Sequence, residues 1–245
     1  MGPAIHLRRL SVAIGSLRVL EQLDVTFAAG SLSAIVGANG CGKTTLLRTI
    51  TGLLTPASGA VDIEGGTRRD IGYLPQHSDV DRSFPISVYD FVASGLWMRC
   101  GVWRRLSLQQ RSAIDNALVR AGLQDLQRRL VGSLSGGQFQ RMVFARMILQ
   151  DTGAILLDEP FNAVDGRTVG VMLETITQWH HEGRTVIVVS HDLPLALHHF
   201  PQTLLMNGEA SCYGATREIL SPARLAGTRA NTATEAAAMT VAGIA

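Results

Sequence analysis

Glycines and one lysine lie close together in the segment GANGCGKTT, residues 37–45. Lys43 is the only lysine among the 22 lysine and arginine residues of the chain. Glycines let successive backbone N–H groups close around phosphate oxygens, and a compact ammonium reaches phosphate inside a tight loop where a planar guanidinium is too wide. The segment is therefore predicted to bind the phosphates of a nucleotide. The residues expected to contact it are Gly37, Ala38, Asn39, Gly40, Cys41, Gly42, Lys43, Thr44 and Thr45.

Cys41 places a thiol inside this glycine-rich segment. A thiol near the start of a helix can have a lowered pKa, which makes it reactive. One hypothesis is that alkylation of Cys41 blocks nucleotide binding and that bound nucleotide protects it. The alternative is that Cys41 is simply a small residue that fits the loop.

Two adjacent carboxylates follow the apolar run of GAILLDEP, at Asp158 and Glu159. In a parallel sheet the carboxyl end of this strand faces the phosphate site. Adjacent carboxylates can divide the work of hydrolysis. Asp158 is expected to act with the Thr44 hydroxyl at Mg²⁺, and Glu159 is expected to position or deprotonate the attacking water.

The segment LSGGQ, residues 134–138, precedes an expected helix. A serine and two glycines at a helix start can form a second anion-binding terminus. Alone, such a segment is more typical of a flexible turn. Its significance depends on the motifs around it.

Alternating elements are expected to position these residues. Apolar runs rich in β-branched residues predict buried strands, and segments with helical spacing predict helices. Residues 86–150 contain only helical patterns, with a capping box at Ser107 and Gln110 and a helix stop at Gly122. The strands are expected at 31–37, 59–65, 71–76, 153–159 and 184–192, and the helices at 44–54, 87–97, 107–123, 136–150 and 167–183.

The alternation predicts an α/β fold with a mainly parallel sheet and an inserted helical subdomain. We expect a single domain over residues 1–225, with its α/β core at 1–85 and 150–225 and the helical subdomain at 86–149. The last residues, 226–245, are small and poor in aromatics, and we expect a mobile tail.

Composition narrows the function classes. The net charge of +2 comes from nearly balanced acids and bases, so nucleic acid is not an expected partner. Three scattered cysteines favour a reducing, cytoplasmic compartment over a disulfide framework. Because no apolar run is long enough to span a membrane, a membrane function is expected to act through a partner.

The order of the motifs resembles that of the ATP-binding subunits of ABC transporters over residues 5–220. The resemblance implies a P-loop NTPase (RecA-like) core with an amino-terminal antiparallel β subdomain, and it implies ATP and Mg²⁺ as cofactors. The motifs that carry it are ANGCGKTT, YLPQ, LSGGQ, ILLDEP, NAVD and VVSHD.

The same resemblance implies roles for individual residues. Glu159 is the expected catalytic base, Gln76 senses Mg²⁺ and the γ-phosphate, and His191 contacts the γ-phosphate. The expected Mg²⁺ residues are Thr44, Gln76 and Asp158. Two copies are expected to pair head to tail with ATP between them, and the residues that act across the interface are Leu134, Ser135, Gly136, Gly137, Gln138 and Asp165.

Ile14 departs from the family pattern, which usually has an aromatic side chain stacked on adenine at about this position. An aliphatic contact is expected to forgo about 1 kcal/mol of stacking. We therefore expect weak discrimination between ATP and GTP.

The stretch HSDVDRSFPISVYDFVASGL, residues 77–96, and PFNAVD, residues 160–165, are similar to ATPases of the zinc, manganese and iron importer branch. This likeness implies a permease partner, an indirect substrate-binding protein partner and a place on the cytoplasmic face of the membrane. It also implies a groove for a permease helix. Its expected floor is Phe84, Pro85, Val88 and Tyr89; Trp97, Met98 and Trp103 either extend it or belong to the core.

Alternatives remain open from the sequence. The cargo and the direction of transport are not encoded in these motifs, so another importer or an exporter is possible. A soluble ABC ATPase without transport is a second alternative, and a small P-loop kinase is a third.

Overall fold

A mainly parallel sheet forms the centre of the computed structural model, which describes residues 1–76, 82–97, 101, 105–162, 164–207 and 210–221. Within these residues the sheet has six strands. Neighbours pair in parallel except β9, which is antiparallel to β8. This confirms the predicted α/β fold. In spatial order the strands are β5 (Ile71–Leu74), β6 (Ala154–Asp158), β7 (Thr185–Val189), β3 (Leu32–Gly37), β8 (Gln202–Asn207) and β9 (Ala210–Ala215).

The carboxyl ends of the central strands are aligned by the pairing register. Asp158 at the end of β6 pairs with Val189 of β7, and Val189 pairs with Ile35 of β3. All residues of β6 and β7 are buried, which fits the continuous apolar runs of a sheet covered on both faces. The segments that follow β3, β6 and β7 therefore leave the sheet side by side.

A second, antiparallel sheet packs beside the first. Among the described residues it contains β2 (Leu17–Phe27), β1 (Ala4–Ile14) and β4 (Ser58–Glu64), in that order. The expected antiparallel subdomain is thus confirmed. The prediction that residues 59–65 form a buried strand was wrong in its burial, because β4 lies at the sheet edge with exposed and half-buried residues.

Helix α1 (Lys43–Ile50) lies between the two sheets. Leu46, Leu47 and Ile50 share one buried cluster with strands of both sheets. The helix ends four residues before the predicted position, because the chain turns through Gly52 with a φ of 82°. The cluster fixes the start of α1 against the end of β3.

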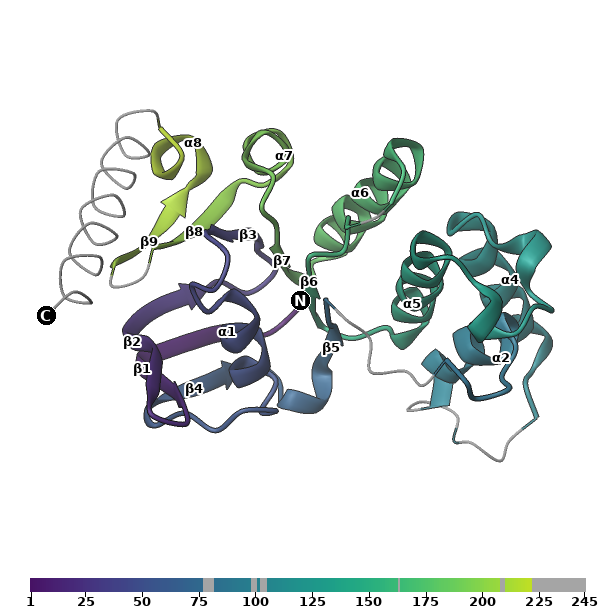
Figure 1. Ribbon diagram of the computed structural model, residues 1–245, viewed down its shortest axis with the longest axis horizontal. Helices are drawn as coiled ribbons and strands as arrows, with labels where there is room; N and C mark the ends of the chain where they lie inside the picture. Colours follow the sequence, from purple (N-terminus) through teal and green to yellow (C-terminus); the bar gives the residue numbers. More distant parts are fainter. Residues whose placement is uncertain (77–81, 98–100, 102–104, 163, 208–209, 222–245) are drawn as a thin grey trace, which may run out of the picture.

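The other helices divide between two regions. Figure 1 shows α2, α4 and α5 together at one end of the molecule, away from the antiparallel sheet. The predicted capping box of Ser107 and Gln110 starts α4, and Gly122 follows its end with a φ of 63°. None of the described helices has the length and apolar character needed to cross a bilayer.

The helix bounds are α2 (Val88–Ala93), α4 (Leu108–Arg120), α5 (Gly136–Gln150), α6 (Gly166–His181), α7 (Leu193–His199) and α8 (Thr216–Ile219). Short 3₁₀ turns occur at Arg68–Asp70, Ser94–Leu96, Gln124–Leu126 and Val131–Ser133. The expected tail at 226–245 lies outside the described residues, as do Met98 and Trp103.

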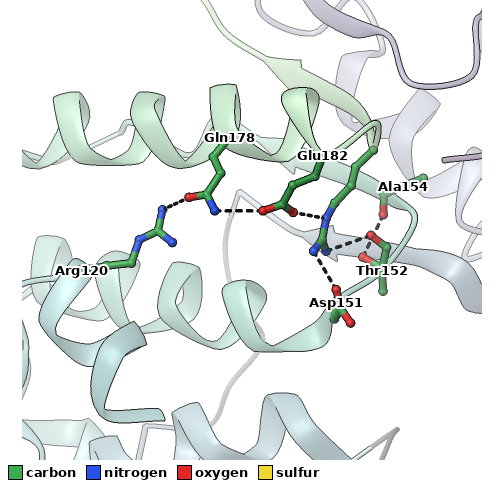
Figure 2. A network of polar contacts seen from close by, with 7 residues as sticks. Arg120, Asp151, Thr152, Ala154, Gln178 and Glu182 are labelled. Atoms are coloured by element: carbon green, nitrogen blue, oxygen red, sulfur yellow. Dashed lines mark hydrogen bonds and ion pairs between the residues drawn. The ribbon is translucent and has the colours of Figure 1, made fainter. Parts of the chain in front are cut away.

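A chain of polar side chains joins the helical region to the central sheet (Figure 2). Arg120 of α4 donates to Gln178 Oε1 at 3.0 Å, and Gln178 donates to Glu182 at 2.9 Å. Glu182 accepts from Arg184 Nε at 2.9 Å, and Arg184 Nη2 donates to Asp151 at 2.7 Å. This network of hydrogen bonds thus extends from α4, across α6, to the loops before β6 and β7.

Within this network, we expect the loss of the Arg184 side chain to lower the free energy of unfolding most. Its side chain is 20% exposed and forms ion pairs with Asp151 and Glu182. Arg184→Ala should lower the free energy of unfolding by about 1–3 kcal/mol, because charged hydrogen bonds are lost at a mostly buried site. The measurement is the urea midpoint at constant slope. Arg8→Ala, which breaks an ion pair with Asp62 at a 70% exposed side chain, is the matched control and should cost about 0–1 kcal/mol. Equal midpoints for the two variants would contradict this.

Candidate functional site

The loop between β3 and α1 has a backbone that only glycine accommodates at several positions. Gly40 and Gly42 have φ values of 82° and 96°, in the left-handed region. A Cβ at Gly37 would lie 2.2 Å from the carbonyl oxygen of Met206. No described side chain caps α1, so the N–H groups of its first turn remain available to an anion.

Lys43 opens α1 and folds back over the loop. Its Nζ donates to the carbonyl oxygens of Gly37 at 2.9 Å and Ala38 at 2.7 Å, and the residue is 5% exposed. These neutral acceptors hold the ammonium at the mouth of the loop. A phosphate oxygen would meet both this charge and the helix amino terminus.

A cavity of about 590 Å³ opens over this loop. It brings together residues that follow β3, β5, β6 and β7, although they lie far apart in the sequence. Two lining residues, Val19 and Asn162, were missed by the sequence reasoning: Val19 has no motif, and Asn162 was quoted within NAVD without a role. The lining residues are Ile14, Val19, Asn39, Gly40, Gly42, Lys43, Thr44, Thr45, Gln76, Glu159, Asn162 and His191.

Asp158 lies beneath the cavity and is fully buried. Its Oδ2 accepts a long hydrogen bond of 3.4 Å from the Tyr73 hydroxyl, and its Oδ1 has no partner within the described residues. Burial raises the pKa of Asp158, and a hydrogen bond from the Thr44 hydroxyl offsets only part of this. A buried carboxylate oxygen without a partner, beside a hydroxyl, fits a Mg²⁺ ion, which prefers oxygen ligands.

The Tyr73 hydroxyl is fixed as a donor toward Asp158. Burial and then the charge of Asp158 raise the pKa of Tyr73 to about 12. The phenol therefore stays protonated and donates to the carboxylate. In the sequence, Tyr73 stands out only as the first residue of the motif YLPQ, which assigned it no role.

Glu159 follows Asp158 in the chain. Its backbone φ is 49°, a value that residues other than glycine rarely adopt. Two amides donate to its Oε2, Gln76 Nε2 at 2.7 Å and Asn162 Nδ2 at 2.5 Å. His191, on the loop after β7, also lines the cavity. The predicted catalytic set of Glu159, Gln76 and His191 is thus gathered at one place, and the role of each member stays a prediction.

The segment LSGGQ lies elsewhere on the chain. Ser135 is the N-cap of α5 and forms a capping box with Gln138. None of residues 134–138 lines the cavity. Asp165, the N-cap of α6, is likewise outside it, and hydrogen bonds from Thr168 lower its pKa. Their action on a second copy stays a prediction.

Cys41 does not have the lowered pKa that was expected. Burial raises the pKa of the thiol, because Cys41 packs against the cluster between the two sheets, and the nearby charge of Lys43 only partly offsets this. This direction gives no support to the alkylation hypothesis and favours the alternative, that Cys41 is a small residue that fits the loop. Gly37, Ala38 and Cys41 all belong to the loop, but none of the three lines the cavity.

The expected permease groove is only partly exposed. Phe84 is 62% exposed and Trp97 is 44% exposed. Val88 was wrongly assigned to this surface, because it is completely buried in the helical core. Pro85 is exposed, and Tyr89 is half-buried.

Known proteins resemble this chain in sequence and in fold. A family model described as ABC transporter matches residues 20–162. The manganese transport system ATP-binding protein MntB of Bacillus subtilis is 35% identical over 221 residues, which cover 89% of this chain and 88% of that protein. The zinc transport system ATP-binding protein TroB of Treponema pallidum is 36% identical over 216 residues, which cover 86% of this chain and 81% of that protein.

A solved structure of the ATP-binding subunit of an ABC transporter superposes on this chain with a TM-score of 0.80. It is 20% identical, and the match covers 93% of this chain and 98% of the other. This likeness shows a common fold.

Ile14 and Val19 contribute two aliphatic side chains to the cavity lining, and Ile14 stands at the position where the family resemblance implies a contact with the base. We expect ATP and GTP to bind with dissociation constants within about threefold of each other, because an aliphatic contact does not read base edges. Ile14→Tyr should tighten ATP binding by about two- to tenfold through stacking. Leu17→Tyr, on the strand position paired with Ile14 but outside the cavity lining, is the control. The measurement is competition against a fluorescent nucleotide. A strong preference of the unaltered protein for ATP would mean that another residue reads the base.

Proposed function

The chain belongs to the ABC transporter family of ATPases, and we propose that it hydrolyses ATP to power the uptake of manganese or zinc through a separate membrane permease. The single observation that carries the ATPase mechanism is that Lys43 and Glu159, which follow β3 and β6, line one cavity at the carboxyl edge of the sheet, with Asp158 next to Glu159. The cargo is proposed from the relatives, one named for manganese transport and the other for zinc transport.

We propose that the phosphates bind at the loop after β3. Lys43 and the first turn of α1 supply positive charge, and the glycines allow the backbone to approach closely. Asn39, Thr45 and Ile14 add contacts along the cavity. When phosphate binds, Lys43 Nζ would donate to phosphate oxygens in place of the carbonyl oxygens of Gly37 and Ala38.

Hydrolysis needs a water in line with the terminal phosphate. Glu159 orients this water and accepts its proton, and His191 and Gln76 contact the γ-phosphate region. Mg²⁺, when bound, neutralises charge on the phosphate oxygens. Thr44, Asp158 and Gln76 are the residues that would hold it.

The remaining residues are proposed to act on a second copy of the chain. Leu134, Ser135, Gly137 and Asp165 lie outside the cavity of their own chain, and this separation supports a site completed by another copy. ATP bound by both copies would stabilise the pair, and hydrolysis would release it. The proposed location is the cytoplasmic face of the membrane, with a substrate-binding protein as an indirect partner.

The exposed side chains of Phe84 and Trp97 support a contact with the permease. Ile86, two residues after Phe84, accepts a hydrogen bond from the Val131 N–H at 3.0 Å, so this segment lies beside residues that precede LSGGQ. A permease helix seated there would act on residues that precede LSGGQ.

The cargo is tested by cellular metal content in a strain of the source organism that lacks this chain. We expect manganese or zinc to fall several-fold, and expression of the unaltered chain to restore it. Glu159→Gln should not restore the metal, because the proposed loss of the base slows hydrolysis by about 10²–10⁴-fold. Glu64→Gln, at a 79% exposed side chain on β4, is the matched control and should restore it.

A rise in the metal would mean export. An unchanged content of manganese, zinc and iron would contradict the proposed cargo while leaving the ATPase assignment intact.

A further inference from the structure

We propose that Asn162 is a positioning residue for Glu159, which holds one oxygen of this carboxylate so that the other faces the attacking water. The inference rests on the proposed role of Glu159 as the base. It concerns a residue to which the sequence motifs assigned no role.

The contacts at Glu159 single out Asn162. Its Nδ2 donates to Glu159 Oε2 at 2.5 Å, and both residues line the phosphate cavity. Gln76 Nε2 donates to the same oxygen at 2.7 Å. Two donors on Oε2 leave Oε1 as the oxygen that can accept a proton from water.

The two donors differ in how they are attached. Asn162 belongs to the same turn as Glu159, and its N–H donates to the Glu159 carbonyl at 3.3 Å. Gln76 lies beyond the end of β5, on a different segment. Gln76 is also proposed to contact Mg²⁺ and the γ-phosphate, so its side chain has partners outside this turn. Asn162, by contrast, moves with the base.

The turn itself is anchored on both sides. The Glu159 N–H donates to Val189 O of β7 at 3.1 Å, and Gln140 of α5 donates to Pro160 O at 3.4 Å. The left-handed φ of 49° at Glu159 bends the chain so that Asn162 comes back over the carboxylate. A residue in such a conformation persists only where its surroundings hold it.

An amide is suited to this position. Its N–H₂ group donates to the carboxylate and cannot take the proton that the base accepts. Removing the donor frees the carboxylate to rotate, and a loss of orientation of this kind lowers the rate of the chemical step rather than the affinity for nucleotide.

The test compares ATP hydrolysis by the full-length chain at saturating Mg-ATP, so that both copies of the proposed pair hold nucleotide, and the dissociation constant for ATP is measured separately. Asn162→Ala and Asn162→Leu, which has a side chain of similar size, both remove the donor without adding charge to the cavity. We expect each to slow hydrolysis at least about tenfold, with the dissociation constant for ATP changed by less than about threefold. Asn116→Ala, on the exposed side of α4, is the matched control and should leave both quantities unchanged.

A double-mutant cycle with Glu159→Gln separates this role from a general structural one. If Asn162 acts through Glu159, adding Asn162→Ala to Glu159→Gln should not slow the residual hydrolysis further. An unchanged rate in Asn162→Ala would overturn the proposal. An equal loss in both backgrounds, or a loss explained by weaker ATP binding, would overturn it as well. A normal rate in Glu159→Gln alone would instead refute the proposed base.

Discussion

The pairing register of the parallel strands β6, β7 and β3 is the constraint on which the site depends. Asp158, Val189 and Ile35 are paired across the sheet, so the segments that follow these strands begin at the same edge. The strands are buried on both faces, and a shift of one residue would exchange the faces of every side chain. The sheet thereby brings a phosphate loop, two carboxylates and a histidine together without any of them having to stabilise the fold.

The cavity at this edge is lined by the groups proposed to bind phosphate and to activate water, but residues 134–138 do not line it. Those residues start α5 in the helical region, where the capping box of Ser135 and Gln138 fixes their backbone. Arg120, Gln178 and Arg184 add polar contacts to the buried apolar cluster that joins this region to the core. This separation is the basis of our proposal that a second copy completes the site and that nucleotide controls their association.

Local patterns in the sequence predicted the elements that depend on neighbouring residues. The box of Ser107 and Gln110, the turn at Gly122 and the end of β6 at Asp158 all follow from residues a few positions apart. Properties set by distant contacts were missed. The pKa of Cys41 depends on burial between two sheets, and the exposure of β4 depends on its place at an edge. Val88 was misplaced for the same reason, since packing among helices decides its burial. The contact of Asn162 with Glu159 is local, but it depends on a left-handed backbone at Glu159 that no motif specified.

The central claim is that one chain holds only part of the site. The most direct test is the molar mass of the protein in solution with and without ATP. Light scattering of the Glu159→Gln variant should give twice the 26.3 kDa of one chain with Mg-ATP, and 26.3 kDa with Mg-ADP. The variant is used because slow hydrolysis preserves the ATP-bound pair. A single-chain mass at saturating ATP, from a protein that binds ATP and whose unaltered form hydrolyses it, would mean that the cavity of one chain is complete and would contradict the account.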